Sequence, residues 1–261
     1  MTTTAKANAV SSFTIIKGAL IPETYAVLRN WDLDKSASDN FDTLRQNNTV
    51  GAGSSNWLRD VIRAIRRRLD PGGRDRQLVR LAKSGCTLDV FKPILLWHIT
   101  RGEFLLRDFL IHWLYPRFRE DVPVLRPADV LPYLSRLTVS GTAVAGSWTE
   151  TTARRVAQGL LLIAADFGLL TGVAVRRFSP YSLPEPSLLY LLHAIMDDTS
   201  SAAKTLDSPD WRMYLMSRGD VENELLRLHQ FRKVHYESAG SIVQLELPCR
   251  SVAEYTERLV A

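Results

Sequence analysis

The chain of 261 residues has few cysteines, and the common catalytic motifs are missing from it. Its two cysteines, Cys86 and Cys249, are far apart in the sequence, which argues against both a disulfide framework and a zinc site and suits a reducing cytoplasm. The five histidines form no HExxH pair, and no Walker loop, GxGxxG or GxSxG pattern occurs. No segment pairs carboxylates with a following base, as metal-dependent nucleases do. These absences predict a protein that is not an enzyme and holds no cofactor or metal.

The sequence also lacks a long uninterrupted apolar run. Residues 94–115 are broken by Arg101, Glu103, Arg107 and Asp108, and residues 160–175 are shorter than the roughly 20 residues needed to cross a bilayer. Residues 1–12 are small and polar, without the apolar segment of a signal peptide. We therefore expect a disordered N-terminal tail over residues 1–12, no membrane contact and a cytoplasmic location.

Positive charge is concentrated in residues 59–83. This segment holds nine basic and three acidic side chains, a net charge of +6 against +5 for the whole chain. A localised Arg-rich face is typical of proteins that bind a polyanion. By contrast, residues 178–261 carry eight bases and twelve acids, a net charge of −4. We expect a polyanion to contact the first two thirds of the chain and the last third to face another partner.

Two consecutive amphipathic helices are predicted within this basic segment. The first covers about residues 56–69, with an apolar stripe that includes Trp57, Val61 and Ile65. Pro71 and the glycines after it end this helix, and a shorter one follows. Each helix presents a basic ridge beside its apolar side. The candidate phosphate-binding residues are Arg59, Arg63, Arg66, Arg67, Arg74, Arg76, Arg80 and Lys83. Aromatic side chains are not interleaved with them, which favours backbone contacts with a duplex over base stacking on a single strand.

The rest of the pattern predicts a mainly α-helical protein. Apolar and aromatic residues over 87–119 are the best candidate for the central core. We expect a helical N-terminal domain over residues 13–139, which carries the basic ridge, and a helical C-terminal domain over residues 140–261. A helix over 148–167 followed by a short extended stretch resembles a winged-helix unit. A second such unit covers 209–247, where a turn at Ala239 and Gly240 predicts a short β-hairpin.

Each winged-helix-like unit has its own charge pattern. In the first, Arg154, Arg155, Arg176 and Arg177 form a candidate second DNA-binding surface, or else pair with local acids. In the second, Asp220, Glu222 and Glu224 begin the helix that would read DNA, where they would repel phosphates. We therefore expect a structural or protein-contact role for the second unit.

An ordered set of short motifs resembles the BrxA family of BREX bacteriophage-defence systems. The set covers most of residues 12–260 and consists of Ser12-Phe13-Thr14, Gly18-Ala19-Leu20, Pro22-Glu23-Thr24, Trp31, the 57–69 helix ending in Arg66-Arg67-Arg68-Leu69, Gly168-Leu169-Leu170, residues 211–215 and residues 234–240. The resemblance implies a cytoplasmic, all-helical, non-enzymatic DNA-binding protein. It also implies partners among the other BREX components, including a DNA methyltransferase and an ATPase, and a fold similar in part to the RNA-binding factor NusB.

Together these observations predict a non-enzymatic accessory protein that binds double-stranded DNA through phosphate contacts with low sequence specificity. Three alternatives remain open: a protein-interaction scaffold within the defence complex, an RNA-binding NusB-like factor, and a nuclease whose acids assemble only in space.

Overall fold

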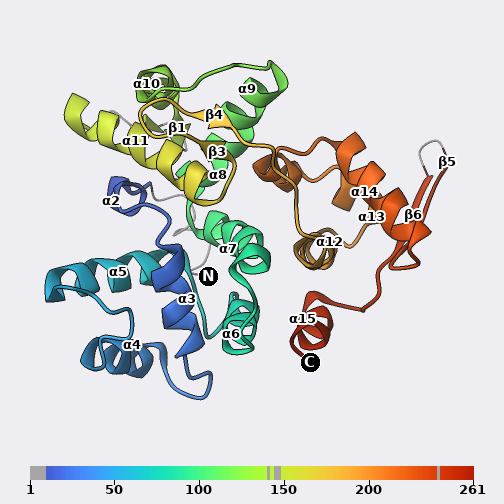
Figure 1. Ribbon diagram of the computed structural model, residues 1–261, viewed down its shortest axis with the longest axis horizontal. Coiled ribbons are helices and arrows are strands. Elements are labelled where there is room, and N and C mark those ends of the chain that lie inside the picture. Colours follow the sequence, from blue (N-terminus) through green and yellow to red (C-terminus); the bar gives the residue numbers. More distant parts are fainter. Residues whose placement is uncertain (1–9, 140–141, 144–147, 240–241) are drawn as a thin grey trace.

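Helices account for most of the chain in the computed structural model, which describes residues 10–139, 142–143, 148–239 and 242–261. The first helices, α2 (Ser12–Ile16), α3 (Ile21–Arg29), α4 (Ala37–Gln46), α5 (Ser55–Arg68) and α6 (Arg76–Lys83), lie together at one end of the molecule (Figure 1). The N-terminal residues 1–9, most of the predicted disordered tail, lie outside the described residues, and Ser12 already begins α2.

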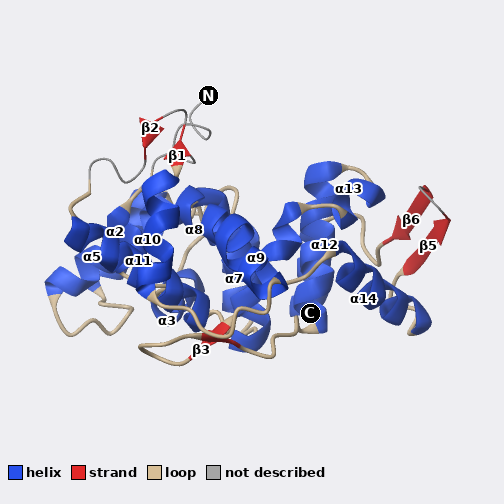
Figure 2. Cartoon of the chain, turned by 90° about the horizontal axis from the view of Figure 1, so that it is seen from above, coloured by secondary structure: helices blue, strands red, loops and turns tan. Residues whose placement is uncertain are grey.

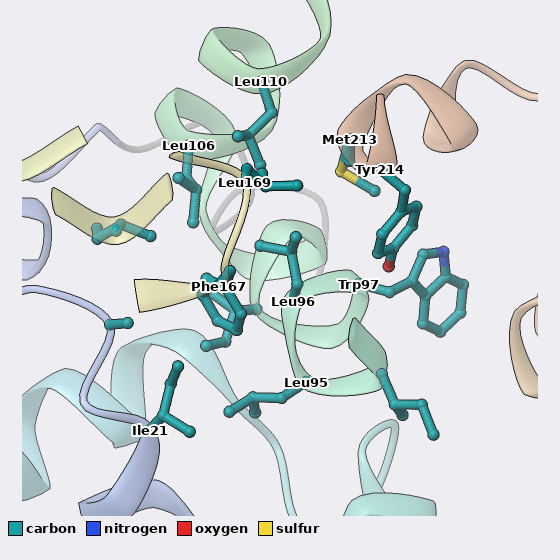
Figure 3. Close-up of a cluster of buried hydrophobic side chains, with 14 of the residues drawn as sticks. Ile21, Leu95, Leu96, Trp97, Leu106, Leu110, Phe167, Leu169, Met213 and Tyr214 are labelled. Carbon is teal, nitrogen blue, oxygen red and sulfur yellow. The ribbon is translucent and has the colours of Figure 1, made fainter. Parts of the chain in front are cut away.

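The apolar segment 87–119 forms the central core, as predicted. It folds as α7 (Leu88–Gly102), α8 (Phe104–Asp108), the π-helical segment η1 (Phe109–Leu114) and α9 (Tyr115–Arg119). Figure 3 shows Leu95 and Leu96 of α7 and Leu106 of α8 in one cluster with Phe167 and Leu169, which follow a later helix. Burial of these side chains holds together two segments that are some 70 residues apart in the sequence.

The next segment packs against the N-terminal helices. It contains α10 (Pro127–Arg136), the short pair β1 (Thr138–Val139) and β2 (Thr142–Ala143), α11 (Glu150–Asp166), and the antiparallel pair β3 (Leu170–Thr171) and β4 (Arg177–Phe178). Helix α11 packs against α2 and α10. The predicted division between residues 139 and 140 thus stays a prediction, with α11 in close contact across it. Residues 140–141 and 144–147 of that predicted boundary lie outside the described residues.

The C-terminal part consists of α12 (Glu185–Thr199), α13 (Ala202–Leu206), the 3-10 segment η3 (Pro209–Tyr214), α14 (Arg218–Gln230), β5 (His235–Ala239), β6 (Ile242–Glu246) and α15 (Val252–Val260). The β5–β6 hairpin lies at the far end of the molecule from α5 (Figure 2). Helix α12 packs on α7, and the hydroxyl of Tyr214 donates a hydrogen bond of 2.9 Å to the carbonyl of Pro93. These contacts join the C-terminal part to the central core.

The structure confirms a mainly α-helical fold with a short C-terminal β-hairpin. Within the described ranges, each of the two predicted units contains a helix followed by a two-stranded sheet, α11 with β3–β4 and α14 with β5–β6, and their likeness to winged-helix units stays a prediction. Among the described residues, no helix has the length and apolar character needed to span a membrane.

Candidate nucleic-acid interface

Helix α5 carries the main part of the predicted basic ridge. Its N-terminus is fixed by Ser54, whose side chain accepts a hydrogen bond of 3.2 Å from the backbone N–H of Trp57. The apolar stripe, including Val61, Ile62 and Ile65, is buried in the core. Because the arginines recur with the same helical period on the other side, burial of this stripe turns part of the basic stripe to solvent.

Three arginines of α5 form the exposed ridge: Arg59, Arg63 and Arg66. Within the described chain none of them is in an ion pair, and the neighbouring acid Asp60 is held by Lys17 at 2.6 Å. The Arg63 guanidinium lies 4.5 Å from the centroid of the Phe13 ring, and Arg66 lies 5.0 Å from that of Phe41. These cation–π contacts place Arg63 on the α2 side of α5 and Arg66 on the α4 side. The ridge therefore extends along α5 between the parts of α2 and α4 that these contacts mark.

Aromatic rings do lie beside the ridge, contrary to the sequence-based expectation. Phe13 is contacted by Arg63 and also by Lys17, whose ammonium lies 5.5 Å from the ring centroid. Lys17 also lies 5.6 Å from the Trp57 ring. The sequence showed Trp57 on the apolar stripe but could not show that α2 brings Phe13 to α5. Because cationic side chains occupy these rings, stacking of nucleic-acid bases on them would require the cations to move.

Arg67, a predicted member of the ridge, points instead toward the interior. It is half-buried, and its Nε lies 3.5 Å from Oε1 of Glu103, a carboxylate that is only 4% exposed. Glu103 also accepts a hydrogen bond of 2.8 Å from the Thr14 hydroxyl. Burial raises the pKa of Glu103, although the neighbouring arginines favour its ionised form. Arg67 thus serves the packing of α5 against α7 and α2.

Arg68 is fully inside the protein, although it contributes to the charge of the basic segment. Its guanidinium donates hydrogen bonds to the carbonyl oxygens of Thr14 at 2.7 Å, Gly18 at 2.9 Å and Ala19 at 3.1 Å. These carbonyls belong to the end of α2 and the turn that follows it. Arg68 thus adds no charge to the surface, but the acid Asp75 of the same segment is buried as well, so the net charge of the remaining side chains of residues 59–83 is still +6.

The second predicted ridge, on α6, is only partly exposed. Arg76 and Lys83 face solvent, whereas Arg80 is paired at 2.8 Å with Glu257 of α15. Arg74, just before α6, is paired with the buried Asp75 at 2.9 Å and donates to the Arg68 carbonyl at 3.1 Å. In Figure 1, α3 lies between α5 and α6. The two basic helices thus present separate patches rather than one continuous row.

A buried polar chain continues inward from Arg74. Asp75 contacts Nδ1 of His98 at 2.7 Å, and Nε2 of His98 lies 2.8 Å from the Tyr190 hydroxyl. Burial raises the pKa of Asp75, but its bonds to His98 and Arg74 outweigh burial and leave that pKa lowered. All three side chains are at most 3% exposed. The sequence pointed to His98 only as a core or surface histidine, and the structure places it in the core as a link between α6, α7 and α12.

The candidate second surface is also partly neutralised. Arg154 pairs with Glu150 at 2.8 Å, one helical turn away, and Arg176 donates to the carbonyl of Gly172 within its own hairpin. Arg155 and Arg177 are exposed. These two arginines come from α11 and β4, the helix and the hairpin of the first winged-helix-like unit. Of the two alternatives, pairing with a local acid applies to Arg154, and a role of the exposed Arg155 and Arg177 in DNA binding stays a prediction.

The family model described as BrxA matches residues 12–194. The chain belongs to the BrxA family. Membership in the BrxA family makes it a BREX-associated protein, as the ordered motifs implied. The match contains α5, α6, α11 and the β3–β4 hairpin, covers every candidate site residue from Arg59 to Arg177, and ends within α12. No curated protein matches the chain.

The part beyond the BrxA match is rich in paired acids. Asp220 forms a capping box with Ser217 at the start of α14, and Arg218 pairs with Asp207 at 2.7 Å and with Glu222 at 2.9 Å. The acids predicted to repel phosphates thus stabilise the helix N-terminus and its neighbours. Among the described residues, no cluster of three or more His, Cys, Asp or Glu side chains could hold a metal ion.

Proposed function

We propose that this BrxA-family protein is a non-enzymatic accessory of a BREX phage-defence system that works in the cytoplasm and binds double-stranded DNA. The observation that carries the proposal is the exposed row of Arg59, Arg63 and Arg66 on α5, which lacks acidic partners among the described residues. Three bases at this spacing extend over about 10 Å of helix, comparable with about three phosphate steps along one strand of a duplex.

Contacts through phosphates would give low sequence specificity. Arginines that lie on aromatic side chains are held in place, so they lose less freedom when they meet a phosphate than a free surface chain would. The rings themselves are covered by cations, which supports backbone contact with a duplex over base stacking on a single strand. Arg155, Arg177, Arg76 and Lys83 would add contacts outside the central row.

The test is fluorescence anisotropy of the full chain with a random duplex over a series of salt concentrations. Three phosphate contacts predict a slope of about −2.7 in log affinity against log salt, or a loss of roughly forty-fold between 50 and 200 mM. The triple variant R59Q/R63Q/R66Q should weaken binding to all duplex sequences and remove that part of the slope. Arg67 is left unchanged because it contacts the buried Glu103.

The matched control is K204Q/R212Q/R250Q, which removes the same charge from exposed positions of the C-terminal part. If both triple variants lose equal affinity, the α5 ridge is not the binding surface. Structured RNA as a competitor separates a NusB-like RNA-binding protein, which RNA would displace from DNA more effectively than a second duplex does. Incubation of the protein with plasmid and Mg²⁺ or Mn²⁺ tests the nuclease alternative directly.

A second candidate function is a protein scaffold within the BREX complex. Its support is the exposure of large apolar side chains in the C-terminal part, with Phe231 at 64% and Ile242 at 72%. Exposed apolar groups of this size are typical of protein contacts. The variant F231S/I242S should then lose co-purification with the methyltransferase or the ATPase while it keeps duplex affinity. Unchanged co-purification would contradict the scaffold function.

A further inference from the structure

A large open cavity lies in the C-terminal part, away from the α5 ridge. Its volume is about 1060 Å³, and its walls come from α12, the end of α14, the β5–β6 hairpin and α15. Figure 1 shows these elements around one region of the molecule. Only the α12 wall belongs to the segment matched by the BrxA family model. The volume corresponds to the upper end of the range found for small-molecule sites.

The floor of the cavity is apolar and firmly held. Leu189, Val234 and Tyr255 are each at most 7% exposed. The Tyr255 ring stacks on His193 with 4.7 Å between the centroids, and its hydroxyl donates to the Pro186 carbonyl at 3.3 Å. Such a floor is already formed before a ligand arrives, so an apolar or aromatic group could settle on it without rearrangement.

The rim of the cavity is cationic although it lies in the acidic third of the chain. It carries Arg232, Lys233 and Arg258 against the acids Glu185 and Glu246. Glu185 is already neutralised, because it pairs with Lys233 and lies 3.4 Å from Arg227. Arg232 and Arg258 have no ion-pair partner among the described residues, which leaves two guanidinium groups available at the rim.

A histidine adds a further donor. Nδ1 of His229 accepts a hydrogen bond of 3.1 Å from the backbone N–H of Tyr236, so Nε2 carries the proton of the neutral ring. The second histidine of the wall, His235, lies with its ring centroid 5.4 Å from that of His229. Guanidinium and imidazole N–H groups beside an apolar floor form a donor set suited to an oxyanion that carries an apolar body.

The backbone at Arg232 supports a role beyond folding. Arg232 follows α14 with φ of +57°, the left-handed conformation in which glycine usually ends a helix. The chain closes this turn with bonds from the N–H groups of Arg232 and Lys233 to the carbonyls of His229 and Leu228, both at 2.9 Å. An arginine here is strained relative to glycine, yet it places a guanidinium at the cavity rim.

We propose that this cavity binds a small organic anion, with a phosphate or carboxylate held by Arg232, Arg258 and His229 and an apolar or aromatic body lying on Leu189, Val234 and Tyr255. The site goes beyond DNA binding and does not depend on it. The two possible sources of the anion, an organic phosphate and an organic carboxylate, share the same recognition chemistry and are separated by the choice of probe.

The test is isothermal titration of the full chain with four probes: adenosine monophosphate, adenosine, indole-3-acetate and inorganic phosphate. The proposal expects binding of adenosine monophosphate or indole-3-acetate, and the stronger of the two identifies the anion. Adenosine and inorganic phosphate alone should bind more weakly, because each lacks one half of the ligand. No binding of either organic anion at millimolar concentration would overturn the proposal, as would equal binding of adenosine monophosphate and either of its parts.

Two variants locate the site. R258Q removes one guanidinium. The loss of its charged hydrogen bond should weaken binding of the organic anion by about tenfold or more. R232G should also weaken binding, yet raise the melting temperature, because glycine relieves the left-handed backbone. The control R250Q removes an exposed charge of the same part that does not line the cavity. Equal weakening by R250Q would overturn the assignment.

The same variants show whether this site is distinct from the surface that binds DNA. R258Q and R232G should keep the duplex affinity of the unaltered chain, whereas R59Q/R63Q/R66Q should keep the affinity for the organic anion. If R258Q and R232G weaken binding of the duplex as much as binding of the small anion, the rim belongs to a nucleic-acid surface and the proposal fails. Failure of the DNA proposal alone would leave the anion-binding result unchanged.

Discussion

The guanidinium of Arg68 in α5 lies 2.7 Å from the carbonyl oxygen of Thr14 in α2. With its further bonds to Gly18 and Ala19, it satisfies one carbonyl at the end of α2 and two in the turn that follows the helix. Helix α2 in turn carries Phe13, on which Arg63 of the exposed ridge lies. A buried arginine therefore fixes the helix that positions an exposed one.

Replacement of Arg68 by methionine should destabilise the protein strongly. The change leaves three buried carbonyls without a donor and removes a cation that favours ionised Glu103. Breaking a buried charged network in this way costs about 3–5 kcal/mol. We expect a drop of roughly 10 °C in the melting temperature, measured by differential scanning calorimetry.

R59M is the control for this prediction, because Arg59 is an exposed arginine of the same helix. It should change the free energy of unfolding by no more than about 0.5 kcal/mol. Adding E103Q to R68M should recover part of the loss, since it removes the acid left without compensation. Similar stability of R68M and R59M would show that the buried bonds of Arg68 contribute little.

Two helical glycines should respond to alanine with opposite signs. A Cβ at Gly159 of α11 would lie 2.5 Å from the carbonyl oxygen of Ile15 in α2, so G159A must push the two helices apart. Such overpacking costs about 1–3 kcal/mol. A Cβ at Gly219 of α14 would come no closer than 3.8 Å to the Ser217 hydroxyl, and G219A should stabilise the helix by up to about 1 kcal/mol. Urea unfolding measures both, and a G159A variant as stable as the unaltered chain would contradict the close packing of α2 on α11.

The sequence was sufficient to predict the helices and strands that depend on a pattern of nearby residues. The α5 helix could be predicted because its apolar residues recur with the helical period and Ser54 precedes them. The β5–β6 hairpin was equally readable from its turn residues, and its strands pair antiparallel in the structure. The exposed ridge of Arg59, Arg63 and Arg66 follows from the same period. Helix α13, a single short turn without a strong apolar stripe, was not predicted.

What could not be predicted depends on contacts between distant segments. Arg66, Arg67 and Arg68 are consecutive, and only the position of α2 decides that Arg68 enters the core while Arg66 stays exposed. The link from Asp75 to His98 and Tyr190 joins residues separated by 23 and 92 positions. No local pattern marks such a chain, because each member is an ordinary polar residue until the fold brings it beside its partner.

Low pH should destabilise the protein because it protonates His193, a buried residue of the C-terminal part. Nδ1 of this buried histidine donates to the Leu189 carbonyl at 2.7 Å, and Nε2 accepts from the backbone N–H of Cys249 at 3.3 Å. Burial lowers the pKa of His193 below its usual 6.5. The unfolded chain therefore binds a proton at a higher pH than the folded chain does, so stability is lost as the pH falls through 6.5 toward the folded pKa.

The pH effect is measured by urea unfolding at pH 7.5 and pH 5.5. His193 should contribute at most about 1.4 kcal/mol of stability per pH unit within this window. H193Q removes the titrating group and should flatten the dependence, whereas H112Q, at a largely exposed histidine, should not. Equal pH dependence in H193Q and the unaltered chain would exclude His193 as the source.

Glu257 should lower the affinity for a duplex, because it pairs with Arg80 of α6. Its carboxylate pairs with Arg80 at 2.8 Å, and 65% of the Glu257 side chain is exposed, so the pair adds less than about 1 kcal/mol to stability. E257Q would therefore leave the fold intact and free Arg80 to meet a phosphate beside Arg76 and Lys83. We expect a higher duplex affinity and a salt slope steeper by about 0.9, measured by anisotropy.

D207N is the matched control, since Asp207 loses the same charge but is paired with Arg218 in the C-terminal part. Any gain in affinity from the net charge of the whole protein would appear equally in both variants, because long-range attraction does not depend on which acid is removed. A gain confined to E257Q would place Arg80 within reach of the duplex. Equal gains would mean that the freed Arg80 makes no contact with the duplex.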